Sequence, residues 1–457
     1  MTPKSHALTT WTRIVALAVF AVVAFVAPAR AASVPIQEVT SPGGIKAWLV
    51  RDDKLPLIAL HFAFRGGVEQ DAPDKQGLAV LAAALLTEGA GPYDAAAFQQ
   101  KLADQSIQLG LSAGRDALEG DVKTLRATRG AAFDLLRLAL TQPRFDAEAI
   151  ERLRGQQLTR IKLQQGDPEW QARRALFAQV FGDHSYGQRQ LGSPAPLGGL
   201  TRDDVRGFAA RHLARDNLVV AVAGDIAPDE LAKALDYVFG ALPAAARLAP
   251  VPDFVASAAS ATLLVPREGT QTQLLFTRPM PRRDDPDWYA AEIVNYILGG
   301  GGFTSRLMRE VRAREGLTYG ISTGLAPMDH ASLLMGQAAA DNPKAGRAYD
   351  LVMQVWRDLY RDGATADEIQ AAKDYLTGAL PLRLTSTEAI ADILVAIQLQ
   401  HLGIDYLDRR SDLIRAVSAE DVQRVIRRWF APEPLTWALV GEPEGITPTF
   451  TQEQTKD

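Results

Sequence analysis

With 457 residues, the chain is too long for one ordinary hydrophobic core, so we expect two or more domains. Its formal net charge of −5 argues against a nucleic-acid partner, because non-specific affinity for a phosphate backbone requires clustered Lys and Arg. The chain contains no cysteine, which excludes disulfides, a lipid-anchored cysteine, a thiolate metal site and a cysteine nucleophile.

The first 31 residues differ from the rest of the chain. Lys4 and Arg13 precede an uncharged run over residues 14–27, and the segment closes with the small-x-small pattern Ala29-Arg30-Ala31. This arrangement is typical of a secretory signal peptide, since the run is shorter than the roughly 20 apolar residues of a spanning helix. We therefore predict a signal peptide over residues 1–31, cleaved near Ala31, a periplasmic or secreted protein, and no stable membrane span. An uncleaved membrane anchor is the alternative.

An internal repeat divides the remaining sequence into two halves. Residues 201–225 match residues 418–442 without a gap, at a constant offset of 217 residues. Each copy begins with a hydroxyl residue, Thr201 or Ser418, and has an acid three positions later, which indicates a capped helix. Each copy then continues with an amphipathic pattern and ends in an apolar strand closed by Gly and an acid. We interpret the two segments as copies of one duplicated unit.

The N-terminal parts of the two halves also correspond, but with less sequence similarity than the repeat itself. Expected strands cover residues 45–50 and 57–64 in the first half, and residues 262–265 and 273–277 in the second. In each half an Asp- and Pro-containing turn then leads into an apolar helix. Residues 243–260 are rich in Ala and Pro without strong periodicity, which is typical of a linker. We therefore predict an N-terminal domain over 34–242, a linker over 243–260, a C-terminal domain over 261–447 and a tail over 448–457.

Strand pairs followed by groups of long helices favour an α+β fold, in which helices cover a largely antiparallel sheet. Two such halves, the turn Arg65-Gly-Gly-Val-Glu69 after the second strand, and the glycine-rich segment from Gly299 to Gly320 together resemble the inverzincin peptidases. This is the family of pitrilysin, insulin-degrading enzyme and the mitochondrial processing peptidase. The resemblance covers about residues 36–445 and implies two homologous halves that face each other across a chamber.

The resemblance also implies a zinc motif, His-x-x-Glu-His, on the helix after the Gly-Gly-Val-Glu turn. In this chain Val80 and Ala84 stand in place of the two histidines, and Ala83 stands in place of the glutamate base. The family's third ligand is a glutamate about 75 residues further on, where residues 156–161 contain no acid. Apolar side chains neither bind zinc nor accept a proton from water. We therefore expect no metal and no cofactor in this chain.

No other residues form a recognisable catalytic set. The histidines after residue 31 are not paired at i and i+4, so we expect structural roles for them, with His184 in a loop over residues 182–187. A Gly-x-Ser-x-Gly nucleophile elbow is absent from the sequence, and no pair of carboxylates stands out. The five histidines in question are His61, His184, His212, His330 and His401.

The segment from Gly299 to Gly320 is the most specific stretch of the chain. Its pattern predicts a glycine turn, a short helix from Thr304 or Ser305, a glycine stop and the start of a strand. A phosphate-binding loop would need Lys and a hydroxyl residue directly after the glycines, whereas Phe303 follows them. This makes a structural turn the better interpretation.

Arg312 and Tyr319 lie seven residues apart across that glycine stop. The zinc-bearing relatives carry an arginine and a tyrosine at this spacing in the second half, within a segment similar to residues 309–319 here, although Ala313 replaces a glutamate. The resemblance implies that both contact the substrate. Tyrosine can donate a hydrogen bond to the oxyanion of peptide hydrolysis, and arginine can hold backbone carbonyls. The alternative is a surface arginine beside a tyrosine of the core.

These observations lead to one main functional hypothesis. The chain is expected to be a non-catalytic subunit that pairs with a homologous zinc-bearing peptidase subunit, and to complete that partner's site for peptide substrates with Arg312 and Tyr319. The zinc would belong to the partner. The alternative is a peptide-binding or scaffold protein of the same fold with no catalytic role.

Overall fold

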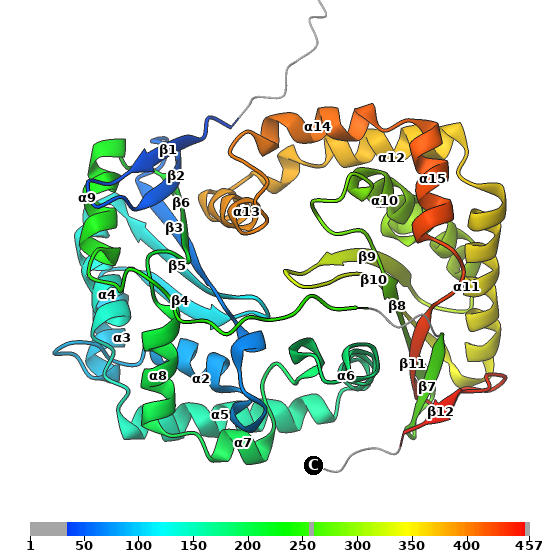
Figure 1. Ribbon diagram of the computed structural model, residues 1–457, viewed down its shortest axis with the longest axis horizontal. Coiled ribbons are helices and arrows are strands. Elements are labelled where there is room, and N and C mark those ends of the chain that lie inside the picture. The colour runs from blue at the N-terminus through cyan, green and yellow to red at the C-terminus, as the bar shows by residue number, and fades with distance from the viewer. Residues whose placement is uncertain (1–33, 256–259, 453–457) are drawn as a thin grey trace, which may run out of the picture. The chain divides into compact units, whose positions relative to one another are not determined.

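The computed structural model describes residues 34–255 and 260–452, so the predicted signal peptide lies outside the described residues. The chain forms two six-stranded sheets with helices packed on them, which confirms the predicted α+β class (Figure 1). The first sheet contains β1 Gln37–Thr40, β2 Lys46–Arg51, β3 Leu57–Arg65, β4 Gln108–Ala113, β5 Ala117–Leu125 and β6 Leu218–Gly224. The second contains β7 Ala261–Pro266, β8 Gln271–Pro279, β9 Ile321–Pro327, β10 Ser332–Asp341, β11 Thr436–Gly441 and β12 Phe450–Thr451.

The two sheets have the same strand order. The first runs β1-β2-β6-β3-β5-β4 and the second runs β12-β7-β11-β8-β10-β9, so β2 to β6 correspond to β7 to β11. Only β2 with β6 in the first sheet, and β7 with β11 and β12 in the second, pair in parallel; the remaining pairs are antiparallel. The duplication therefore covers five of the six strands of each sheet, whereas β1 and β12 differ: β1 is antiparallel to β2 and β12 is parallel to β7. One difference from our prediction is β12, which lies in the segment expected to be a tail.

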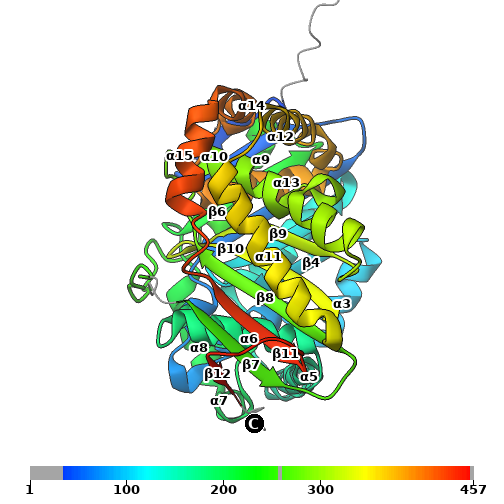
Figure 2. The same ribbon diagram turned by 90° about the vertical axis from the view of Figure 1, so that its right-hand side faces the viewer.

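Helices occupy the stretches between the strands. The first half contains α2 Leu78–Leu85, α3 Ala95–Asp104, α4 Arg129–Thr141, α5 Ala147–Gln165, α6 Pro168–Phe181, α7 Pro194–Gly198, α8 Arg202–His212 and α9 Pro228–Phe239. The second contains α10 Trp288–Asn295, α11 Asn342–Asp362, α12 Ala366–Gly378, α13 Thr387–Leu399, α14 Tyr406–Ala416 and α15 Ala419–Trp429. Figure 2 shows α11 crossing one face of the second sheet.

The repeated helices α8 and α15 begin at the predicted caps. The Thr201 hydroxyl accepts a hydrogen bond from the Asp204 N–H, and the Asp204 carboxylate accepts one from the Thr201 N–H. Ser418 and Asp421 form the same reciprocal pair. This capping box satisfies two N–H groups that the helix itself leaves unpaired, which explains why the pattern is visible in the sequence.

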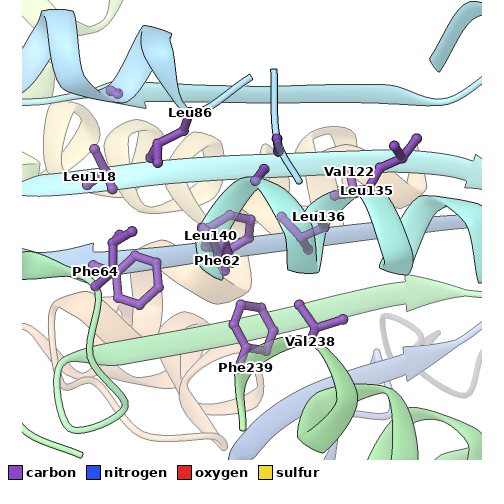
Figure 3. Close-up of a cluster of buried hydrophobic side chains, with 14 of the residues drawn as sticks. Phe62, Phe64, Leu86, Leu118, Val122, Leu135, Leu136, Leu140, Val238 and Phe239 are labelled. Carbon is purple, nitrogen blue, oxygen red and sulfur yellow. The ribbon is translucent and has the colours of Figure 1, made fainter. Parts of the chain in front are cut away.

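Each half has its own apolar core, and each core contains the same aromatic contact. In the first, Phe62 on β3 lies opposite Gly120 on β5, among the buried side chains of Figure 3. A Cβ atom added to Gly120 would lie 2.1 Å from the ring of Phe62. In the second, Phe276 on β8 lies opposite Gly336 on β10, where an added Cβ would lie 2.0 Å from the ring. The ring occupies the space that a side chain on the facing strand would need.

The halves also exchange a helix. On α6, in the first half, Ala172, Ala175 and Leu176 are buried against apolar residues of β7, β8 and β11. From the second half, α13 packs on β3 and β6, where the Gln398 side chain donates to the Val220 carbonyl at 3.0 Å. When the 217-residue offset of the repeat is added to the bounds of α6, they agree with the bounds of α13 to within two residues. The two helices are therefore equivalent in the duplication. Each sheet is therefore covered on one face by a helix of the other half.

Candidate functional site

The helix α2 occupies the position at which the zinc motif was expected. Its start is fixed by Asp71, whose carboxylate accepts hydrogen bonds from the N–H groups of Gly77 at 2.9 Å and Ala79 at 3.0 Å. Burial, opposed by these hydrogen bonds, raises the pKa of Asp71 to about 7. Val80 and Ala84 are half-buried, one turn apart, and Ala83 is buried. None of the three side chains carries a lone pair for a metal ion.

The helix α5, which would carry the third ligand, packs against α2. It presents Gln157, whose buried side-chain amide donates hydrogen bonds to the carbonyls of Gly77 at 3.1 Å and Leu191 at 2.8 Å. A neutral amide used in this way supports the local backbone. Across residues 34–255 and 260–452, no group of three or more His, Cys, Asp and Glu side chains is arranged to hold a metal ion. The residues present do not fit a zinc site.

Each of the five histidines has its own polar contact, and two of them, His184 and His330, also pack against the ring of Tyr186, at 4.8 and 6.1 Å between ring centres. His212 is buried, and burial lowers its pKa to about 4, while its Nδ1 lies 2.8 Å from the Phe208 carbonyl. His184 accepts a hydrogen bond from the Tyr186 N–H at 3.1 Å and so fixes its own loop. The other three contact charged side chains: His61 contacts Asp392, His330 lies 3.2 Å from Asp253, and His401 lies 2.9 Å from Arg65.

The glycine-rich segment differs from its prediction in helix type. A π-helix over Tyr296–Gly300 and a 3₁₀ turn over Gly302–Thr304 come first, and a second π-helix covers Met308–Arg314. The N–H of Glu315 bonds to the Glu310 carbonyl at 3.2 Å, which is the wide i→i+5 pattern. Gly316 ends the helix at φ +62°, as the predicted glycine stop requires.

Gly299 is required for close packing. A Cβ added there would lie 2.6 Å from the hydroxyl of Thr323 on β9. The glycine run is therefore a contact between this segment and the second sheet, and the hydroxyl of Ser305 bonds to the Gly302 carbonyl at 2.8 Å to close the turn. This geometry agrees with the structural turn.

Arg312 and Tyr319 are brought together by this unusual helix. The Nε of Arg312 donates a hydrogen bond to the backbone carbonyl of Tyr319 at 2.7 Å. The guanidinium group also lies over the ring of Phe303, 4.8 Å from its centre. Tyr319 is 83% exposed and Phe303 is 72% exposed, so Tyr319 is not a core residue. Phe303 was not predicted as part of this cluster, because an exposed aromatic after a glycine run carries no signal of its own.

The charge of Arg312 is not neutralised. Arg306 pairs with Glu368 at 2.6 Å, and Arg314 and Arg309 lie 2.6 and 3.8 Å from Glu310. Arg312 has no carboxylate within ion-pair distance in the part of the chain that the structure describes. Its two terminal amino groups remain available, and Arg presents them as a planar fork suited to carbonyl or carboxylate oxygens.

Comparisons with known proteins bear on the family and the fold. A family model described as the peptidase M16 inactive domain matches residues 199–376. A crystal structure described as the peptidase M16 inactive domain from Pseudomonas fluorescens has a TM-score of 0.83, with 27% identity over 91% of this chain and 99% of that one. The chain belongs to the M16 peptidase family.

Two curated M16 relatives bear on the type of member. A protein named as a non-peptidase homolog from Helicobacter pylori is 25% identical over 84% of this chain and 89% of its own length. An uncharacterised zinc protease of Streptomyces coelicolor is 31% identical over 65% of this chain and 66% of its own length. With its zinc positions apolar, this chain is an M16 member of the non-catalytic type.

Proposed function

We propose that this M16 chain is the zinc-less subunit of a two-subunit peptidase, and that it completes the active site of a zinc-bearing homologous subunit with Arg312 and Tyr319. The observation that carries the proposal is the state of Arg312. Its guanidinium is held in place by the Tyr319 carbonyl and the Phe303 ring, and neither neutralises its charge. A positioned and unpaired cation beside an exposed phenol is arranged for a ligand.

The chemistry of the two side chains assigns their roles. When water attacks a peptide carbonyl, negative charge develops on the carbonyl oxygen, and the Tyr319 hydroxyl can donate a hydrogen bond to it. Arg312 binds backbone carbonyl oxygens of the same peptide and so fixes its position. The partner's zinc would supply the activated water. This chain contributes binding and oxyanion stabilisation.

The location of the complex is part of the proposal. The charged start, apolar run and small-x-small end of residues 1–31 support export of the chain, and the partner would share that compartment. Within residues 34–255 and 260–452, no helix combines the length and apolar content that a membrane crossing needs. The expected substrates are short or unfolded peptides in the periplasm.

The test is reconstitution with a zinc-bearing M16 homologue from the same cell. Removal of one oxyanion donor typically lowers kcat by about 10² to 10³. We expect Tyr319→Phe to lower the kcat of the complex by that factor, and Arg312→Ala to raise KM as well. The control is Tyr375→Phe, at another exposed tyrosine, with unchanged kcat. Full activity of Tyr319→Phe would disprove the catalytic role, and tight peptide binding without hydrolysis would favour the scaffold alternative.

A further inference from the structure

A pocket of about 280 Å³ opens in the first half, where the end of α4, the helix α8 and the segment that leads into the linker meet (Figure 1). One wall is a single face of α8, because positions i, i+3, i+4 and i+7 of a helix lie on one side. The residues at these positions are Arg206, Ala209, Ala210 and, directly after the helix, Leu213.

The rest of the lining is almost entirely apolar. The hydroxyl of Thr141, the other polar side chain of the pocket, already donates a hydrogen bond to the Arg137 carbonyl at 2.7 Å. Arg206 is therefore the single charged residue of the lining. Three of the apolar residues also belong to the buried core of the first half, namely Leu140, Phe145 and Leu242.

The side chain of Arg206 is free. Within residues 34–255 and 260–452 it makes no hydrogen bond, ion pair or ring contact, and it is exposed. Arg202, one turn earlier on α8, instead donates a hydrogen bond to the Arg144 carbonyl at 2.6 Å. An unpaired guanidinium at the mouth of an apolar pocket offers donors and positive charge to the anionic group of a ligand whose body enters the pocket.

The second half uses the same position differently. Arg206 corresponds to Gln423 in the 217-residue repeat, and α4 corresponds to α11, since these helices follow the equivalent strands β5 and β10. The Gln423 amide donates a hydrogen bond to the Ala364 carbonyl at 3.2 Å. It also packs so closely on Gly363 that an added Cβ would lie 2.1 Å from its Oε1. In the second half this side chain therefore fills the space beside the loop.

A longer loop makes room in the first half. Residues 142–146 join α4 to α5, whereas only residues 363–365 join α11 to α12. Within the longer loop, Phe145 has φ +50°, a left-handed conformation that residues with a side chain rarely adopt, and its ring is buried. This loop forms an apolar wall of the pocket and gives Arg206 no hydrogen-bond partner.

We propose that this pocket binds a small free carboxylic acid with an apolar body, of the aryl-alkanoate type, whose carboxylate pairs with Arg206. The volume of about 280 Å³ is sufficient, because a cavity of about 150 Å³ already holds benzene. The apolar lining disfavours a bare inorganic anion, which would lose water without gaining other partners. The unpaired guanidinium favours an anion over a neutral ligand of the same shape. None of the lining residues belongs to the cluster of Arg312 and Tyr319, so this site is independent of the proposed function.

The experiment is a titration of the purified full chain with 3-phenylpropionate at pH 7 and low salt, followed by saturation-transfer NMR. We expect saturable binding. 3-Phenylpropanamide has the same body without the charge, and it should bind about 3- to 5-fold more weakly, which is the effect of an exposed ion pair. Acetate has the charge without the body, and it should bind at least roughly 10-fold more weakly.

Three variants locate the ligand. Arg206→Gln, which copies Gln423, should remove the preference for the acid over the amide. Ala210→Phe should weaken the binding of both by at least roughly 10-fold, because the new ring takes the place of the ligand. Arg160→Gln is the matched control, since Arg160 on α5 is exposed and has no side-chain partner within the described residues; both affinities should stay unchanged.

Several results would overturn the proposal. Equal affinity for the acid and the amide, or no saturable binding of the acid, would show that Arg206 and the pocket do not act together. Acetate that binds as well as 3-phenylpropionate would reduce the site to a surface anion contact. Full binding in Ala210→Phe would place the ligand elsewhere. Tighter binding of the tripeptide Gly-Gly-Phe than of 3-phenylpropionate would assign the pocket to the C-terminal residue of a peptide instead of a free acid.

Discussion

Replacement of Gly120 by alanine is the sharpest test of how the first core is packed. The added methyl would lie 2.1 Å from the nearest ring carbon of Phe62, where carbon atoms in contact require about 3.5–4.0 Å. Gly120 has no positive φ, so the substitution acts through this clash alone. The ring has little space to move, because Phe62 is almost fully buried and packs edge-on against Phe64 and Phe239 at 5.8 and 5.6 Å between ring centres (Figure 3).

The size of the effect follows from the displacement required. Overpacking a rigid core costs typically 1–3 kcal/mol, and a shift of more than about 1 Å places Gly120→Ala near 3 kcal/mol. For a domain of about 200 residues, each kcal/mol lowers Tm by roughly 2–4 °C, so we expect a fall of about 6–12 °C. Gly336→Ala, opposite Phe276 in the second half, should show a fall of the same size.

The assay is thermal unfolding followed by circular dichroism, together with urea unfolding. The control is Gly155→Ala on α5, where an added Cβ meets nothing within 4 Å and the gain in helix propensity should stabilise the protein by up to about 1 kcal/mol. Adding Phe62→Leu to Gly120→Ala should recover part of the loss, since the two sites are in contact. If Gly120→Ala unfolds within about 1 °C of the parent, the packing described here is wrong.

Three further predictions concern charge and metal. Burial, opposed by the Gly67 N–H and reinforced by Asp116, raises the pKa of Glu69 from 4.5 to about 8. Between pH 4.5 and 8 the Glu69 carboxyl is protonated in the folded protein and ionised in the unfolded chain, so unfolding releases a proton. The free energy of unfolding therefore falls as pH rises through this range, by at most about 1.4 kcal/mol per pH unit. In urea unfolding at several pH values, Glu69→Gln should remove this pH dependence. Asp287→Asn should cost about 1.5–3 kcal/mol in urea unfolding, because the nearly buried carboxylate receives hydrogen bonds from Arg428 at 3.0 Å and the Trp429 indole at 2.8 Å; a loss under about 0.5 kcal/mol would count against it. Protein incubated with zinc and desalted should retain well below one zinc per chain in elemental analysis, and a retained stoichiometric zinc would reveal a ligand set absent from the motif.

Local signals explain what was predictable. The caps at Thr201 and Ser418 are formed by residues three apart, and the strands after them are continuous apolar runs. A short stretch of sequence therefore contains all the residues that determine these helices and strands. The loss of the zinc motif at Val80 and Ala84 is equally local. Two apolar side chains on one helix are enough to exclude zinc binding there. The structure adds that α5 presents Gln157, a neutral amide, in the region where an acidic ligand would be needed.

Contacts between distant segments account for what was missed. The exchange of α6 and α13 follows from apolar helix faces that pack on the sheet of the other half. The sequence of neither helix indicates which sheet it covers. The π-helix over Tyr296–Gly300 packs Gly299 against Thr323 of β9, and helix propensity does not encode such a contact between distant segments. Phe303 joins the cluster only because the second π-helix places Arg312 over its ring. The resemblance singled out Arg312 and Tyr319 as substrate contacts, which stays a prediction, and it did not indicate the hydrogen bond between Arg312 and the Tyr319 carbonyl.

The exchanged helices bear on how a catalytic half can lose its chemistry and still persist. Because α6 covers the sheet formed by β7, β8 and β11, deletion of the first half would expose Leu263, Val265 and Leu275 to water. The second half therefore depends on the backbone and packing of the first for its own stability, whether or not the first half binds a metal. Val80 and Ala83 belong to the core of the first half, whereas α6 makes the cover of the second sheet, so that cover does not require metal ligands on α2. A duplicated protein built in this way can become inactive in one half without becoming shorter.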